Sequence, residues 1–556
     1  MLRKKSAWLS LLLVLMLIVS ACSRSSTGGE TKPPETNTPP TTNNPAPSGP
    51  KILTIGMWSA PDSFNSITNK TSYGTLVISV VYPSLYALTP KLEYEPRLAS
   101  SYTMNPEQTE FTFKLNPNAK WTDGKPITAE DVAYTFQVIA HPDTPTSRRS
   151  LIDTIKGLDA AGVSETKDFN VSGIQVVDAQ TIKFTTKKPV DVDAFMEKVA
   201  SGIYIMPKHM LEPFVKADLK GLDKSEITMK PTVFGGPYKL VQYVTDQHVE
   251  LAPNENYFLG KPKLDKLFYK IVGQATFAAA LEKGEIDVAS GNGVGEVPIA
   301  DWEKVSSLST LTPITYVAPS YQYLDINVAL PEFSNPKVRQ AIAHAINRPL
   351  IVQRLLKGQG EVLNTPINSA NKYYNKDIQS QLAYDPAKAK KMLQDAGWDF
   401  NKEITLLTPT GNVVREQSAD IIMANLQEAG MKVKIEKVDF PTRQARSAKG
   451  EFQLSLVGFS ATFDPDISAQ TSSTGAFNDR KYKNAKMDEL LAKGKEIVKF
   501  EQKKPHYDQI QQHFIDEMPF IPLYAVKALA AVNKRVVNAA PNPAGLTWNA
   551  HTWDVK

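Results

Sequence analysis

Short runs in which apolar and polar residues alternate recur along the chain, separated by segments with the spacing of amphipathic helices. Residues 51–57 and 111–115 alternate with the period of two that is typical of strands. After the second run, residues 122–125 form a turn, and Thr128 followed by Asp131 is a helix-start signal. The pattern predicts a strand, a turn and a helix in this order.

Two further segments of the first half predict one helix and one strand. Residues 75–88 are mostly apolar, with Tyr82, Leu85 and Tyr86 at helical spacing, which favours a helix whose tyrosines pack in the core. Residues 203–209 have the pattern of a strand that meets a turn. Together with the strands on either side, these segments indicate a mixed α/β arrangement.

Strands and helices alternate regularly in the second half of the chain. Pro336 stands in the first turn of one amphipathic helix, whose buried face carries Val338, Ile342 and Ala345. This alternation favours a second α/β lobe. The predicted strands are 323–327, 404–408 and 433–438, and the predicted helices are 335–348, 385–396 and 416–428.

The first 22 residues have a pattern of their own. Arg3, Lys4 and Lys5 precede an almost wholly apolar run that ends at Cys22, the only cysteine of the chain. The run is too short to cross a bilayer comfortably, since a spanning helix needs roughly 20 residues, and it is typical of a secretory signal. A buried or unused thiol is the alternative interpretation of Cys22.

This segment resembles a bacterial lipoprotein signal. The resemblance implies that residues 1–21 are removed and that Cys22 carries a lipid. The protein would then be held on the outer face of the bacterial cytoplasmic membrane, at a Gram-positive-type cell surface. Residues 23–50 lack large apolar side chains and are rich in Pro, Thr, Asn and Ser, so they cannot bury a core. We expect residues 22–50 to form a disordered tether.

Composition limits the remaining function classes. The chain has 556 residues, which predicts two or three domains, and a formal net charge of +5, to which Arg3, Lys4 and Lys5 contribute. Such a small charge makes nucleic acid a poor partner. A cysteine assigned to the anchor leaves none for an internal disulfide.

Motifs of catalysis and metal binding are missing from the sequence. The glycines of residues 291–295 lack the Lys-Ser or Lys-Thr of a phosphate loop, and neither His-Glu-x-x-His nor Gly-x-Ser-x-Gly occurs. The seven histidines are scattered, and the nearest pair, His506 and His513, is two helical turns apart. We therefore expect no enzyme activity, no metal and no cofactor.

An ordered series of motifs resembles the peptide, dipeptide and nickel branch of the extracellular solute-binding proteins that serve ABC importers. The resemblance implies an α/β, bilobal, periplasmic-binding-protein-like fold with an extra subdomain in the first lobe and a hinge cleft between the lobes. The motifs are Glu95-Pro96-Arg97-Leu98-Ala99, Trp121-Thr122-Asp123-Gly124, Gly236-Pro237-Tyr238, Asn256-Tyr257, Gly284-Glu285-Ile286-Asp287, Val338-Arg339-Gln340-Ala341-Ile342 and Asp385-Pro386-Ala387-Lys388-Ala389.

The same resemblance suggests how the chain divides. The extra subdomain would interrupt the first lobe, and the chain would return to that lobe at its end. The expected segments are 1–21 (signal), 22–50 (tether), 51–92 (first lobe), 93–206 (extra subdomain), 207–312 (first lobe), 313–519 (second lobe) and 520–556 (first lobe).

By resemblance, the ligand-facing stretch is residues 456–466. Thr462 stands where oligopeptide and dipeptide binders place an aspartate for the peptide's ammonium group, and Asp464 and Asp466 are the nearest acids. Leu456 and Val414 stand where some of these binders have an arginine and a histidine. The candidate ligand-binding residues are Trp58, Phe459, Ser460, Thr462, Phe463, Asp464 and Asp466, and Tyr73, Tyr82, Tyr373 and Tyr374 are further aromatics that could cover a ligand.

Two interpretations of the acids stay open, because Asp464-Pro465-Asp466 can also simply shape a turn.

The expected function is a monomeric, membrane-anchored receptor that captures oligopeptides and delivers them to the permease of an ABC importer. An oligosaccharide, an opine-like compound or a metallophore is the alternative ligand. From another class, an extracellular glycosidase would need two carboxylates roughly 5–10 Å apart, and no spacing singles out such a pair.

Overall fold

A 12-stranded sheet dominates the part of the chain that the computed structural model describes, residues 49–556. Strands β12 (Leu311–Val317) and β14 (Gly360–Val362) pair with β18 beside the main path. The order along that path is β16 (Lys432–Val438), β15 (Glu403–Pro409), β17 (Leu454–Ser460), β13 (Ser320–Ile326), β18 (Phe520–Asn533), β11 (Val288–Ala289), β1 (Ile52–Met57), β10 (Lys266–Ile271), β9 (His248–Pro253) and β8 (Tyr238–Val244).

Strand β18 belongs to both halves of this sheet. Its first residues pair with β13 and β14, and Lys527 to Asn533 pair with β12. The two halves have separate hydrophobic cores, one built around β1 and β8 to β10 and the other around β13, β15 and β17. We call them the first and second lobes, and β12, β13 and β18 are the strands through which the chain passes between them.

The first lobe is built on β1, whose Leu53, Ile55 and Met57 are fully buried. Besides the sheet strands it contains α1 (Ser72–Val81), β2 (Tyr86–Leu88), β3 (Tyr94–Pro96), α6 (Gln274–Glu282), α7 (Trp302–Ser306), β19 (Val536–Val537) and β20 (Asp554–Val555).

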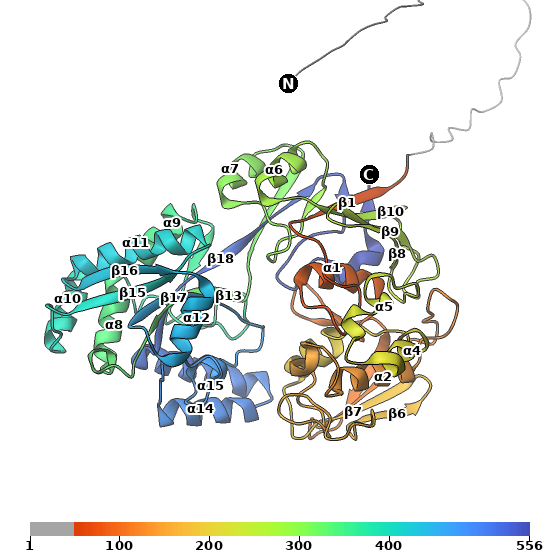
Figure 1. Cartoon of the computed structure of the whole chain (residues 1–556), viewed down its shortest axis with the longest axis horizontal. Helices are drawn as coiled ribbons and strands as arrows, with labels where there is room; N and C mark the ends of the chain where they lie inside the picture. The colour runs from red at the N-terminus through yellow and green to blue at the C-terminus, as the bar shows by residue number, and fades with distance from the viewer. Residues whose placement is uncertain (1–48) are drawn as a thin grey trace, which may run out of the picture. The chain divides into compact units, whose positions relative to one another are not determined.

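An additional four-stranded antiparallel sheet follows β3, in the order β4 (Ala99–Met104), β5 (Glu110–Leu115), β7 (Thr181–Thr185) and β6 (Ile174–Asp178). Helix α2 (Ala129–Ala140) packs on β6 and β7 of this sheet, α4 (Lys208–Asp218) packs on α2, and α5 (Glu226–Met229) packs on α4 (Figure 1). The predicted start of α2 is confirmed, because the Asp131 carboxylate accepts the N–H of Thr128 at 2.9 Å in a capping box.

Helix α3 (Val192–Phe195) and the π-helical turn Met196–Ser201 complete this subdomain. Asp191 caps α3, since its carboxylate accepts the N–H of Ala194 at 3.0 Å. The segment 191–201 is short, but it carries three acids that meet the second lobe.

The second lobe repeats a strand and helix alternation around the parallel strands β15, β16 and β17. Helix α11 packs on β15 and β16, while α8 and α10 pack on each other (Figure 1). Its helices are α8 (Pro336–Ala345), α9 (Arg348–Arg354), α10 (Pro386–Asp395), α11 (Val413–Glu428), α12 (Phe440–Lys449), α13 (Ser468–Thr471), α14 (Ala485–Glu496) and α15 (Phe500–Glu517).

Three predicted elements differ from the structure for local reasons. Helix α1 ends at Val81, because Pro83 forces an extended conformation on Tyr82. The predicted helix 335–348 is broken after Ala345, since Pro349 starts a new helix that Asn347 caps. Residues 203–206 form no strand, and α4 begins directly after Pro207.

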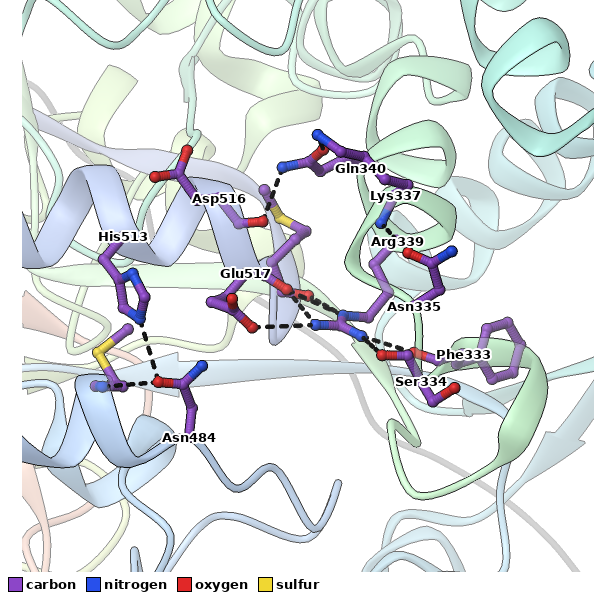
Figure 2. A network of polar contacts seen from close by, with 12 residues as sticks. Phe333, Ser334, Asn335, Lys337, Arg339, Gln340, Asn484, His513, Asp516 and Glu517 are labelled. Atoms are coloured by element: carbon purple, nitrogen blue, oxygen red, sulfur yellow. Dashed lines mark hydrogen bonds and ion pairs between the residues drawn. The ribbon is translucent and has the colours of Figure 1, made fainter. Parts of the chain in front are cut away.

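Arg339, from one of the sequence motifs, holds the second lobe together (Figure 2). Its side chain is 2% exposed, and it donates to the carbonyl oxygens of Phe333, Ser334 and Met518, each at 2.8 Å. The Glu517 carboxylate lies 3.8 Å away. A buried guanidinium needs such partners, so Arg339 fixes the start of α8 against the end of α15. It is a scaffold residue.

Some expectations fall on residues that the structure does not describe. The signal 1–21, Cys22 and nearly all of the tether 22–50 lie outside residues 49–556. Among the helices within that range, none combines the length and the apolar composition needed to cross a membrane.

Candidate functional site

Three cavities that share walls surround residues 459–467, the stretch after β17. The largest, about 230 Å³, lies against the first lobe, and another of about 160 Å³ lies in the second lobe. A narrow cavity of about 30 Å³ shares lining residues with each of them. Glu197 and Phe463 line both the first and the narrow cavity, and Asp464 lines both the narrow cavity and the second-lobe cavity. We call them the first-lobe, seam and second-lobe cavities.

The seam cavity lies where the segment 191–197 of the first lobe meets the second lobe. Lys503 of α15 forms an ion pair with Asp191 at 2.9 Å, and the two side chains are only 5% and 11% exposed. A second ion pair joins Lys372 to Asp193. Because the first pair is buried, separating its two charges while they stay buried would be costly.

The Lys503 ammonium is also enclosed by aromatic rings. It lies 5.7 Å from the ring centre of Tyr373 and 5.8 Å from that of Tyr507, within the range of cation–π attraction. On the first-lobe side, the Tyr94 hydroxyl donates to the carbonyl oxygen of Asp193 at 2.9 Å. The seam therefore combines acids, lysines and tyrosines from both lobes.

Glu197 and Asp464 are the acids of the seam that have no lysine or arginine nitrogen within 4.0 Å among residues 49–556. The Phe463 N–H donates to the Glu197 carboxylate at 3.4 Å, a long bond between the lobes. Burial raises the pKa of Glu197 to about 7, and nearby Asp464 and Asp193 contribute. Burial also raises the pKa of Asp464, an effect that Lys503 opposes. Both carboxyl groups would be stabilised as anions by an added cation.

Asp466 has a different environment from Asp464. Its carboxylate accepts the backbone N–H and the hydroxyl of Ser468, each at 2.9 Å, and pairs with Lys495 at 3.2 Å. These bonds shape the turn before α13, and Asp466 also lines the second-lobe cavity. Asp464 accepts the N–H of Asp466 at 3.1 Å and lines the seam and second-lobe cavities.

The second-lobe cavity is lined by Phe459, Ser460 and Thr462, all predicted from the sequence. They lie at the end of β17 and in the loop that follows it, where Ser460 pairs with Ser320 of β13. The Asn371 amide donates to the Phe463 carbonyl oxygen at 2.9 Å and fixes the loop. At Gly458 a Cβ would meet the amide end of the Gln322 side chain, which would have to move.

Trp58 lies apart from the other predicted site residues. Its indole N–H donates to the carbonyl oxygen of Glu296 at 3.2 Å, and its ring packs edge-on against Phe277. It lines none of the three cavities. Of the other aromatics, Tyr82 lines the first-lobe cavity and Tyr373 the seam cavity.

Sequence reasoning missed the acids that the first lobe contributes. Asp193 and Glu197 are four residues apart after Pro189, so they share one helix face, and this spacing was the available signal. It could not show that the face meets Lys372, Lys503 and Asp464, which are remote in sequence. Within residues 49–556, no three histidine, cysteine or acidic side chains are grouped in a way that could hold a metal ion.

The fold and most of the sequence match known proteins. A family model described as "Bacterial extracellular solute-binding proteins, family 5 Middle" matches residues 93–481. The chain is 29% identical over 572 residues to the oligopeptide-binding protein AppA of Bacillus subtilis, and the match covers 99% of both sequences. The predicted bilobal α/β fold is confirmed by the match to solved structures of solute-binding proteins.

One of these structures is that of AppA from Bacillus subtilis in complex with a nonapeptide. It has a TM-score of 0.71 and 26% identity, and the match covers 91% of this chain and 99% of AppA. The substrate-binding protein CtaP from Listeria monocytogenes has a TM-score of 0.78 and 24% identity, with 91% of this chain and 99% of CtaP covered.

Proposed function

The chain belongs to the bacterial extracellular solute-binding proteins of family 5, and from this premise we propose that it captures oligopeptides for an ABC importer. The near full-length similarity to AppA, a protein named for oligopeptide binding, supports this ligand class. The observation that carries the proposal is the acidic seam, where Glu197 of the first lobe and Asp464 of the second line the same narrow cavity.

The seam has the chemistry to hold the ammonium group of a peptide. Within residues 49–556, Asp191 and Asp193 have lysine partners whereas Glu197 and Asp464 have none, so a cation placed beside them would be the missing partner. A shift of one pKa unit corresponds to about 1.4 kcal/mol of differential interaction, so lowering the raised pKa of Glu197 would contribute to affinity. Phe463, Tyr82 and Tyr94 offer apolar walls for side chains.

Delivery follows from closure of the lobes. The chain crosses between them through β12, β13 and β18, so small changes in those strands would open or close the seam. A ligand that contacts both lobes favours the closed form by its differential affinity. The closed form would then be the one that the permease recognises.

We also propose that the protein is not an enzyme. Its relatives are binding proteins of transporters. A glycosidase needs two carboxyl groups whose environments push their pKa values apart, one a proton donor and the other ionised. Burial raises the pKa of both Glu197 and Asp464, so the seam does not mark one of them as the group that stays ionised.

The proposed location rests on the sequence before the described residues. The apolar run and Cys22 support a lipid anchor on the outer face of the cytoplasmic membrane, with residues 22–50 as the tether. An acyl chain alone binds membranes only marginally, so stable attachment would need the several chains expected on a lipoprotein cysteine.

Native mass spectrometry of protein purified without refolding tests the ligand class. We expect bound masses that fragment as peptides, and a rise in thermal midpoint when the stripped protein is mixed with a peptide pool. Ligand at 100 times Kd stabilises a protein by about 2.7 kcal/mol, a readily measured shift. Bound sugars or metal complexes instead of peptides, with no thermal shift in the pool, would reject the oligopeptide and support the alternative ligands.

A further inference from the structure

Four acids from the two lobes meet at the seam, with two lysines among them. Asp191, Asp193 and Glu197 come from the first lobe, and Asp464 comes from the second. Lys503 pairs with Asp191 and Lys372 with Asp193, which leaves two carboxyl groups without a basic partner within 4.0 Å in residues 49–556. Contact between the lobes therefore brings together more acid than base.

Among the four acids, Glu197 is the one that this excess of acid over base affects most directly. It joins the lobes by accepting the Phe463 N–H at 3.4 Å, a bond too long to offset much of the cost of burying a carboxylate. Separation of the lobes would return Glu197 to water. Its pKa would then fall from about 7 toward the ordinary 4.5, because burial is the main cause of the shift.

We propose that contact between the lobes at this seam takes up one positive charge, supplied by a proton on Glu197 or Asp464 when the cleft is empty and by a cationic group of the ligand when it is filled. Only the second half of this proposal rests on the proposed function. The ligand's cation and the proton would compete for the same place, so a cationic ligand closes the receptor at a pH where the empty cleft stays open.

The direction of the pH effect follows from which state binds the proton more tightly. The joined lobes bind the proton more tightly than the separated lobes. Protonation therefore favours the contact fully below about pH 4.5, and this stabilisation is lost as the pH rises through about 7. Across this interval the ratio of joined to separated lobes falls by roughly tenfold per pH unit, or roughly 300-fold in total.

The titration is assigned to the carboxyl groups of Glu197 and Asp464 and not to the groups around them. The ammonium groups of Lys372 and Lys503 remain in their ion pairs with Asp193 and Asp191. Tyr94 stays neutral, since burial raises its pKa far above that of a free tyrosine. The other titratable groups near the two carboxyl groups are Tyr373, whose pKa is also raised by burial, Lys198, next to Glu197 in the chain, and Tyr507 and Asp466 on the second-lobe side.

Small-angle X-ray scattering of the ligand-free protein between pH 4.5 and 8.5 tests the proposal without a ligand. We expect the radius of gyration of the wild type to increase with pH. Glu197→Gln, which mimics the protonated acid, should keep the smaller radius over the whole range, and Asp464→Asn should weaken the dependence.

Glu296→Gln is the matched control. Glu296 is a half-buried acid whose pKa is raised by desolvation and which accepts one backbone N–H, from Gly293 at 2.7 Å, but it lies within the first lobe. This variant should follow the wild type. A wild-type radius that does not change with pH, or an unchanged transition in Glu197→Gln, would overturn the proposal, and either result would leave the peptide-binding test standing.

Discussion

Asp464 and Asp466 show how two identical side chains, two residues apart, take different roles. The Asp466 carboxylate is used by Ser468 and Lys495, whereas Asp464 lines the seam and has its pKa raised by burial. From the sequence, both were candidates for an ammonium partner and both could shape a turn. The choice depends on Lys495, Lys503 and Glu197, which the local sequence cannot position.

Replacing Asp464 with Asn should weaken the binding of peptides with a free amino terminus by roughly 2–5 kcal/mol, because a buried ammonium would lose its charged partner. N-acetylated forms of the same peptides should change little. Isothermal titration calorimetry with a peptide recovered from the protein measures both.

Asp466→Asn is the control for this prediction. It keeps an oxygen that can cap the turn to Ser468 and removes the charge that pairs with Lys495, a partly exposed pair of small energetic value. Equal losses for free and acetylated peptides in Asp464→Asn would contradict the assignment.

At the level of elements, sequence pattern predicted most strands and helices, and its errors cluster at prolines. Pro83 ends α1 earlier than the apolar spacing suggests, and Pro349 divides one predicted helix into α8 and α9. The motif containing Arg339 identified relatives, but its physical role is visible only in the structure. The carbonyl oxygens of Phe333 and Met518, which are far apart in the sequence, accept hydrogen bonds from one guanidinium. No local sequence pattern encodes this contact.

Arg339→Ala should lower the free energy of unfolding by roughly 3–5 kcal/mol, since it leaves buried carbonyl oxygens of two elements without a donor. Lys337→Ala, on the exposed side of the same helix, should cost less than about 0.5 kcal/mol. Urea denaturation of both variants provides the comparison. Similar midpoints for the two would show that the Arg339 network adds little to stability.

At the scale of the whole molecule, the alternation of strands and helices and the ordered motifs predicted two α/β lobes, and the fold confirms them. The boundaries of the seven expected segments stay predictions. The contact between the lobes could not be predicted, because it joins residues 191–197 to residues 372, 463 and 503, which only the closed tertiary structure brings together. The first-lobe half of the candidate site was missed for this reason.

Attachment of the whole protein to the membrane is predicted from Cys22 alone. In a bacterial host that processes lipoproteins, Cys22→Ser should release the protein to the medium or leave it unprocessed, because the lipid is attached to the thiol. Fractionation with immunoblotting distinguishes these outcomes from the wild type. Mature protein that remains in the membrane fraction of the variant would mean that another attachment exists.

The ion pair of Lys503 with Asp191 should hold the lobes together in the absence of ligand. Lys503→Met leaves Asp191 as an uncompensated acid at a buried contact, which costs up to about 3–5 kcal/mol unless the lobes separate. Separation returns Asp191 to water, so we expect a larger radius of gyration at low pH, where protonation of Glu197 otherwise favours contact. Lys495→Met, which breaks a pair inside the second lobe, should not change the radius.

A double-mutant cycle with Asp191→Asn isolates the pair itself, because the asparagine oxygen can still cap α3. If Lys503 acts through Asp191, the second substitution should reduce the radius of Lys503→Met toward that of the wild type, since the buried charge is removed. Additive effects of the two substitutions would mean that Lys503 acts on the seam through Tyr373, Tyr507 or Asp464 rather than through Asp191.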